Sequence, residues 1–298
     1  RGIGLIGDLN LTEDKISGKL EVNNPNYNYT GNAVNAALSV SSTEAPISGY
    51  DSSKTGVSLG TSFEQYEDVW FTPKIIATYE DIEVETTASS AIQKMEGSFT
   101  NIDLEYGIWL DKRNQVYQPT EGYKTGFEQR LPILQDSSSI INTYDISAYN
   151  DLSEDVIGSV KFFIRSIHGV DEDVRLTNRL FLPRHKLRGF NTSKVGPKDG
   201  EDYIGGNYTS ALSLEAGLPN LLPESYRTDF SLFLDTANVW SVDYSDSIDD
   251  SNKIRSAVGI GANVFTTIGP LSFTIAQDIS KASTDETETF NFRLGTSF

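Results

Sequence analysis

Two histidines are the first candidates for acid-base chemistry, because histidine alone has an ordinary side-chain pKa near neutrality. They stand at His168 and His185, in or beside one long polar segment. A hydrolytic site needs a histidine with a carboxylate or serine partner. His185 instead lies between Arg184 and Lys186, so we interpret it as a solvated loop residue. We expect no catalytic residue and no enzymatic activity.

Paired carboxylates are the second candidates. Asp103 with Glu105, and Asp229 with Asp235, have spacings that could imitate a glycosidase pair or a Ca²⁺ site. We favour instead a polar lining on one face of a strand. Other acidic residues are interpreted as solvated turn residues, namely Asp249, Asp250, Asp285, Glu286 and Glu288. With no cysteine and no Gly-rich loop that opens a helix, we expect neither a metal nor another cofactor.

The charge balance and hydropathy limit the partners. Forty-two acidic against 24 basic residues give a net charge of −18, which argues against nucleic acid as a partner. The mean hydropathy is −0.33, and no apolar run approaches the roughly 20 residues of a spanning helix. A membrane-spanning strand needs only about 10 residues that alternate between apolar and polar, so hydropathy does not exclude a membrane protein built of strands.

Alternation of apolar and polar residues predicts the elements that must position these side chains. It is clearest from Asn101 to Asp111, where apolar residues fill the even positions. It recurs at 207–218, 226–235, 254–264, 271–275 and 290–298. Weaker repeats lie at 2–12, 15–23, 32–43, 54–64, 69–83, 121–132, 139–150 and 156–167. The pattern predicts about fourteen short strands, each bounded by turn-forming residues.

Alternation alone does not separate a membrane barrel from a secreted β-sandwich, which remains the alternative. Aromatic residues at strand ends favour the membrane, as an interfacial girdle would place them: Tyr66, Trp70, Tyr117, Tyr123, Tyr149, Tyr226 and Trp240. Small residues and paired charges on the polar faces suit a wet lumen. We therefore predict an all-β fold, a closed antiparallel transmembrane β-barrel formed by residues 1–298 as a single domain.

One long interruption, from about residue 168 to 204, is rich in Arg, Lys, Gly and Pro. Loops of this length are usually functional or disordered. Alternation assigns Glu215 and Asp235 to the lumen on two successive strands. If the loop enters the lumen, the guanidinium of Arg188 could bridge both carboxylates through charge-assisted hydrogen bonds. The alternative is that Arg188 is a solvated loop residue.

An ordered series of motifs begins in this loop. It consists of Leu187-Arg188-Gly189-Phe190, Val195 to Lys198, Gly205 to Asn207, Ser213 to Glu215, Phe233 to Trp240 and Gly269 to Leu271. The series resembles the (V/L)RGF, IGPK, GGN, SLE, FxDxGxVW and GPL motifs of the BamA superfamily, with Ala237 in place of the usual glycine. That superfamily includes barrel-assembly insertases, translocation-assembly proteins and two-partner-secretion transporters. Its members usually have sixteen strands, so either a hairpin is missing between Val40 and Lys54 or the count of fourteen is wrong.

The resemblance implies roles for particular residues. It implies that Arg188 pairs with Glu215 and Asp235, which locks the loop carrying Leu187, Gly189 and Phe190 inside the barrel. It also implies a weak lateral seam where the last strand meets the first. Glycines weaken strands, and the residues we assign to the seam are Gly2, Gly4, Gly7, Gly295 and Phe298.

The function that the resemblance implies is insertion and folding of outer-membrane β-barrel proteins in the bacterial outer membrane. The expected partners are nascent outer-membrane proteins, periplasmic accessory lipoproteins and the lipid bilayer. Periplasmic POTRA domains are expected to precede Arg1 in the full protein. A polypeptide-secretion pore of the two-partner type and a passive porin remain alternatives.

Overall fold

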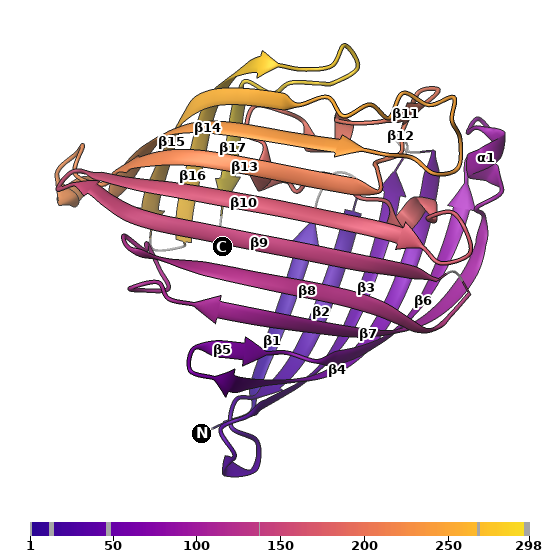
Figure 1. The fold of residues 1–298 in the computed structure, drawn as a ribbon, viewed down its shortest axis with the longest axis horizontal. Helices are drawn as coiled ribbons and strands as arrows, with labels where there is room; N and C mark the ends of the chain where they lie inside the picture. The colour runs from indigo at the N-terminus through magenta and orange to yellow at the C-terminus, as the bar shows by residue number, and fades with distance from the viewer. Residues whose placement is uncertain (1, 12–14, 46–48, 137, 267–268, 295–298) are drawn as a thin grey trace.

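The structure is a computed structural model that describes residues 2–11, 15–45, 49–136, 138–266 and 269–294. In these ranges one large antiparallel sheet dominates, and it curls round into a barrel with a front wall and a back wall (Figure 1). No helix in the same ranges is long and apolar enough to cross a membrane. The predicted all-β fold is confirmed.

The sheet follows the order of the chain. Its first half consists of β1 (Gly4–Leu11), β2 (Lys15–Asn24), β3 (Ala33–Ala45), β4 (Tyr50–Tyr66), β5 (Val69–Phe71), β6 (Lys74–Val84) and β7 (Gly97–Asp111). Its second half consists of β8 (Gly122–Gln135), β9 (Ser139–Ser153), β10 (Val156–Gly169), β13 (Tyr208–Leu218), β14 (Thr228–Trp240), β15 (Arg255–Thr266), β16 (Gly269–Ser280) and β17 (Phe290–Leu294). Successive strands pair antiparallel, which places β1 and β17 at the two edges of the sheet.

The strands β5 and β6 occupy one position in this sheet. Both pair with β4 on one side and with β7 on the other. Thr72 and Pro73 separate them, and proline cannot donate a backbone hydrogen bond to a neighbouring strand. With β5 and β6 counted together, the sheet has the predicted fourteen positions. No hairpin is missing between Val40 and Lys54, because β3 and β4 pair directly across that interval.

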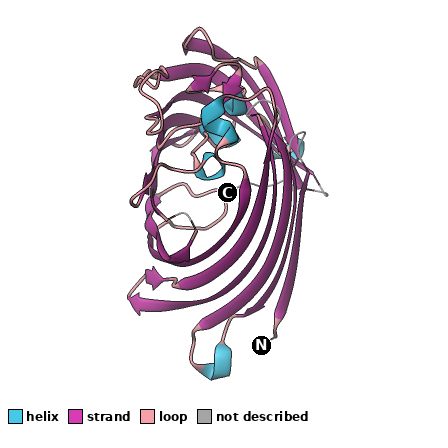
Figure 2. Cartoon of the chain, turned by 90° about the vertical axis from the view of Figure 1, so that its right-hand side faces the viewer, coloured by secondary structure: helices cyan, strands magenta, loops and turns pink. Residues whose placement is uncertain are grey.

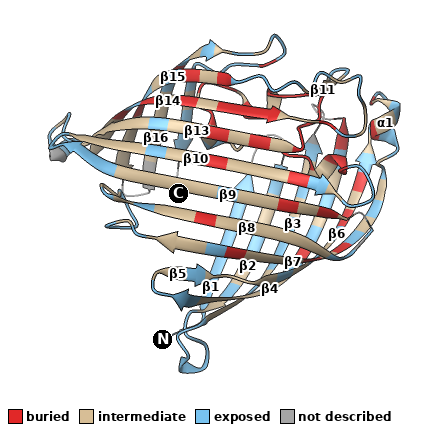
Figure 3. Cartoon of the chain, viewed as in Figure 1, coloured by how far each residue is buried: buried red, intermediate tan, exposed pale blue. Residues whose placement is uncertain are grey.

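The outward faces of the strands are apolar and exposed. Examples are Leu59 at 60 %, Ile260 at 52 % and Leu232 at 50 % exposure. The inward faces include buried polar residues, such as Thr209 and Asp235. A water-soluble sandwich would show the reverse arrangement, so this distribution supports a barrel that faces lipid. Figure 3 colours most strand residues tan or pale blue, and the buried residues, in red, form short stretches in β9, β10, β13, β14 and β15.

The two ends of the barrel differ. Long connections gather at the end that carries α1 (Ser90–Gln93), β11 (Lys198–Asp199) and β12 (Asp202–Tyr203) (Figure 1). An apolar cluster at this end joins residues of two strands with residues of several connections, namely Tyr50, Ile82, Ala88, Ile92, Leu176, Ile204 and Val242. The connections at the opposite end have at most ten residues each, and outer-membrane barrels carry their shorter connections on the periplasmic side.

The segment between β10 and β13, residues 170–207, is the longest connection. It contains the 3₁₀ helices η2 (Leu176–Asn178), η3 (Arg184–Lys186) and η4 (Thr192–Lys194). Figure 2 shows short helices and loops between the barrel walls near one end. We call this segment the lumen loop, because Leu182, Leu187 and Phe190 pack in one buried cluster with inward residues of the strands.

Candidate functional site

The guanidinium of Arg188 lies at the centre of a polar network on the inner face of β13 and β14. Its Nε donates to Asp235 Oδ2 at 2.7 Å, its Nη2 to Asp235 Oδ1 at 2.8 Å, and its Nη1 to Glu215 Oε2 at 2.8 Å. The Ser213 hydroxyl accepts from Nη2 at 3.1 Å and donates to Asp235 at 2.7 Å. The structure thus brings together the three residues that the sequence singled out, in a bidentate geometry that favours arginine over lysine.

The strands place these partners side by side. Ser213 and Asp235 face each other in the pairing of β13 with β14, and Glu215 lies two residues along the same face of β13. Asp235 is fully buried, whereas the side chains of Arg188 and Glu215 keep 21 % and 22 % of their exposure. The Phe233 ring stacks on one face of the Arg188 guanidinium, with the ring centroid 3.5 Å from Cζ.

The electrostatics keep Arg188 charged. Burial lowers the pKa of its guanidinium, but the hydrogen bonds and negative charges of Asp235 and Glu215 outweigh burial and raise the pKa above its ordinary value. The backbone N–H of Arg188 also donates to Asp235 at 3.0 Å. The carboxylate therefore holds both the side chain and the main chain of the lumen loop.

Gly189 permits the close approach of the loop to the wall. Its φ is +91°, a conformation that other residues rarely adopt, and a Cβ there would lie 2.9 Å from that of Ala276 and 3.2 Å from that of Ala257. Leu187 and Phe190 on either side are buried against Phe163 and other apolar residues of the wall. The tetrapeptide thus combines an ion pair, a close backbone contact and two apolar anchors.

A second buried ion pair escaped the sequence analysis. Arg255 at the start of β15 donates from Nε and Nη2 to the two carboxylate oxygens of Asp285, at 2.8 and 3.0 Å. Its Nη1 donates to Asn238 Oδ1 at 2.6 Å. The side chains of Arg255 and Asp285 are 4 % and 0 % exposed. The interpretation of Asp285 as a solvated turn residue is therefore wrong, because the loop before β17 folds inward, whereas Asp249, Glu286 and Glu288 are exposed as expected.

The loop before β17 is also bonded to the lumen loop along the main chain. Asn191 N donates to Glu286 O at 3.0 Å, and Glu286 N donates to Lys194 O at 3.2 Å. Glu288 N donates to Gly189 O at 3.0 Å. An isolated β-bridge joins Phe190 to Thr287. The connection at 281–289, which we call the β16–β17 loop, therefore adds a short ladder to the RGF segment.

The remaining carboxylates form polar lining of the lumen. Glu105 bridges Lys74 at 2.6 Å and Arg130 at 2.5 Å. Asp103 is 5 % exposed, and Asp229 accepts from Gln118 Nε2 at 2.6 Å. The Glu105 carboxylate is thus paired with two cationic side chains. In the part of the chain that the structure describes, no group of three or more His, Cys, Asp or Glu residues could hold a metal ion.

Neither histidine has the surroundings of a general base. His168 Nε2 lies 2.7 Å from the Tyr208 hydroxyl, and the Tyr208 ring stacks on Trp240. His185 lies in η3, and its side chain is partly exposed. Partial desolvation by the surrounding protein, followed by the charges of Lys186 and Arg293, lowers its pKa to about 4. Such a histidine is neutral and only weakly basic near pH 7.

The seam residues are only partly within the described ranges. Gly4 and Gly7 lie in β1, Gly2 precedes that strand, and Gly295 and Phe298 lie outside the described residues. A Cβ at Gly7 would meet no atom within 4 Å. Among the described residues β1 pairs only with β2 and β17 only with β16. The two edge strands thus have free backbone groups along one side there.

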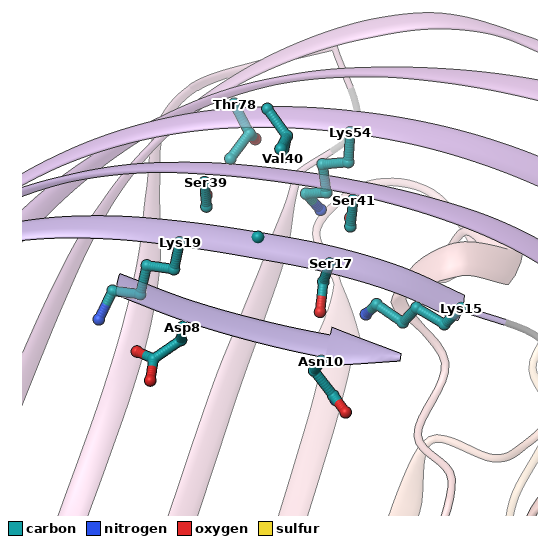
Figure 4. Close-up of a pocket in the computed structure, with 11 residues that line it drawn as sticks. Asp8, Asn10, Lys15, Ser17, Lys19, Ser39, Val40, Ser41, Lys54 and Thr78 are labelled. Atoms are coloured by element: carbon teal, nitrogen blue, oxygen red, sulfur yellow. The ribbon is translucent and has the colours of Figure 1, made fainter. Parts of the chain in front are cut away.

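The lumen beside β1 is open and polar. A pocket of about 280 Å³ lies on the inner face of β1 to β4 and β6. Figure 4 shows its hydroxyl and charged side chains, which include Asp8, Lys19, Ser39, Lys54 and Thr78. β1, β2 and β3 contain no buried residue in the ranges that can be described. The lumen loop therefore packs against β10 to β16 and, at the end that carries α1, against β4 and β6, and it leaves the side near β1 to β3 open.

Comparisons with known proteins agree with this architecture. The chain is 25 % identical over 229 residues to the outer membrane protein assembly factor BamA of Neorickettsia risticii, a match that covers 72 % of this chain and 30 % of the relative. It is 27 % identical over 139 residues to the BamA of Neisseria meningitidis serogroup B, which covers 38 % of this chain and 17 % of that protein. The chain thus spans less than a third of the curated relatives it matches.

Solved structures share the fold. The crystal structure of BamA from Haemophilus ducreyi lacking POTRA domains 1-3 superposes with a TM-score of 0.86 at 22 % identity, over 97 % of this chain and 63 % of that one. CdiB from Acinetobacter baumannii gives a TM-score of 0.55 at 12 % identity, over 98 % of this chain and 59 % of that one. Relatives and fold alike identify an outer-membrane β-barrel. The model of the Omp85 superfamily domain matches residues 2–298, and the chain therefore belongs to that superfamily.

Proposed function

We propose that this barrel inserts and folds outer-membrane β-barrel proteins without covalent chemistry. The observation that carries the proposal is the pair of sheet edges, since β1 and β17 have no strand partner on their outer sides among the described residues. A free strand edge can template an incoming strand through main-chain hydrogen bonds. The relatives named as outer membrane protein assembly factors support the same function.

In this proposal β1 and β17 form a lateral seam that opens toward the bilayer. A substrate strand would pair with an exposed edge before it leaves water, which lowers the cost of burying its unpaired backbone groups in lipid. The glycines of β1 favour opening, because glycine lowers the stability of a strand. The Arg188 network would hold the lumen loop in place while the seam opens and closes. Nascent outer-membrane proteins, periplasmic accessory lipoproteins and preceding POTRA domains are the proposed partners.

A secretion pore is the second candidate, favoured by the fold that the chain shares with CdiB. A passive porin has less support, because the lumen loop packs inside the barrel and fills one side of the lumen. The test uses the full-length protein in lipid vesicles and in planar bilayers. We expect faster folding of a substrate barrel and a small, unsteady conductance. A large steady conductance with no effect on folding would instead support a pore.

A further inference from the structure

The described part of β17 is short and has a neighbour on one side only. It comprises five residues that pair with β16. The β16–β17 loop leads directly into Phe290, the first residue of β17. Its last residue, Thr289, accepts a hydrogen bond through its carbonyl oxygen from Ala276 N at 2.9 Å. The loop therefore determines where this edge strand begins. Whatever holds the loop also holds the strand.

Two sets of contacts hold that loop, and both lead to the lumen loop. The first is the buried pair of Arg255 and Asp285, in which Asp285 also accepts from Ala282 N at 2.6 Å and from Gly196 N at 3.4 Å. The second is the main-chain ladder between residues 189–194 and 286–288. Tyr203 adds a hydrogen bond from its hydroxyl to Thr284 O. The lumen loop and the β16–β17 loop thus form one bonded unit.

We propose that Arg255 and Asp285 are positioning residues that couple the lumen loop to the edge strand β17. This inference rests on the proposed function, since it identifies the regulation of the seam. While Arg188 holds the lumen loop, the ladder and Asp285 hold the start of β17 against β16. When the lumen loop is displaced, the main-chain ladder is lost and the start of β17 becomes free to separate from β16.

The physical chemistry favours a stepwise switch over a gradual one. Asp285 is fully buried and its charge is neutralised by Arg255, so a partly broken pair would leave an unpaired charge in the interior. The pair is therefore either formed or solvated. Coupling of this kind is reciprocal: release of the lumen loop lowers the free energy needed to release β17 by the same amount as release of β17 lowers that of the lumen loop.

The test is hydrogen exchange, measured by mass spectrometry on the full-length protein in lipid vesicles without substrate. Asp285→Asn removes the charge and keeps the shape of the side chain. We expect exchange on the order of tenfold faster in both 187–194 and 290–294. Asp278→Asn is the matched control. It removes a carboxylate from the same hairpin, but that carboxylate pairs only locally, with Lys281. It should leave both segments unchanged.

A second variant protects the test against misfolding of the first. Arg188→Lys leaves the β16–β17 loop untouched in sequence, and reciprocity predicts faster exchange at 290–294 as well as in the lumen loop. Faster exchange confined to 281–286 in Asp285→Asn, or no effect of Arg188→Lys on β17, would overturn the coupling. Since no substrate is present, either result leaves the proposed insertase function to its own assay.

Discussion

At the scale of single residues, Arg188 combines several contacts that no other residue type could make together. It bridges Asp235 and Glu215, stacks on Phe233 and lies beside a glycine that allows the main chain to reach the wall. Lysine would supply a charge but could not contact both oxygens of Asp235 and also reach Glu215. The network therefore depends on the guanidinium itself.

Arg188→Ala should release the lumen loop. The change leaves Asp235 buried without its partner, and removal of one member of a buried pair costs roughly 3–5 kcal/mol. We expect a value near the lower end, because Arg188 and Glu215 keep part of their exposure. Limited proteolysis within 170–207 should become faster, and folding of a substrate barrel slower. Arg184→Ala removes an exposed cation from the same loop and serves as control; equal protease resistance of both variants would contradict the prediction.

The histidine of the lumen loop predicts a pH dependence. The pKa of His185 is lowered from 6.5 to about 4, first by burial and then by Lys186 and Arg293. Between these pH values the unfolded loop binds a proton that the folded loop does not, so the stability of the folded loop falls as the pH decreases. We expect protease protection of the loop to weaken from pH 7 to pH 5, and His185→Gln to reduce this loss. An identical pH profile for both proteins would argue against a role of His185.

At the scale of elements, alternation located all fourteen positions of the sheet, because a barrel between lipid and lumen alternates on every strand. The break between β5 and β6 was missed, because Thr72 still pairs with Gly107 and Pro73 O still accepts from Thr61 N. Only the missing N–H of Pro73 interrupts the ladder, and the faces on either side are unchanged. Alternation assigned Asp235 to the lumen correctly. It could not identify the pair of Arg255 and Asp285, because it reports the face of a residue and not its partner in a distant loop.

The connection from 112 to 121 lies at the end of the barrel opposite α1, and it reaches across to the opposite wall. Tyr117 contacts Phe265 edge to face, with ring centroids 6.2 Å apart, and Gln118 donates to Asp229. β9, β10 and β13 lie between these partners in the sheet order. The turn thus crosses part of this mouth of the barrel.

Tyr117→Ala should free that turn. An aromatic pair contributes about 0.5–1.5 kcal/mol beyond its buried area, so the turn should detach for a larger fraction of the time. We expect a two- to tenfold rise in the open fraction of single-channel records. Val116→Ala, at a neighbouring position that is 77 % exposed, should leave the records unchanged. Matching records for the two variants would show that the turn does not limit conductance.

At the scale of the whole molecule, the exposed apolar residues of the strands face outward, and the inward faces carry the polar residues together with the apolar clusters that hold the lumen loop. This arrangement explains a mean hydropathy of −0.33 in a membrane protein, since polar lumen and loop residues offset the lipid-facing ones. It also predicts where a charge is tolerated. The outward side chain of Leu232 on β14 is 50 % exposed, whereas Leu221, 58 % exposed, lies in the turn after β13.

Leu232→Arg should lower the free energy of unfolding in lipid vesicles by about 2–4 kcal/mol, the cost of a cation near the middle of the bilayer. Leu221→Arg should cost about 0–1 kcal/mol, because the turn lies near the interface. Urea unfolding monitored by tryptophan fluorescence provides both values. Equal costs at the two sites would contradict a lipid-facing wall.

The one-sided filling of the lumen also constrains how this barrel is made. Leu187 and Phe190 pack against Ala211, Ala237 and Ala257 of strands that follow them in the chain. The lumen loop is therefore synthesised before the surface that will bury it. Burial of the lumen loop must therefore wait until β13, β14 and β15 have joined the sheet. Docking of the loop is then a late step in the biogenesis of this barrel, later than synthesis of the strands that hold it.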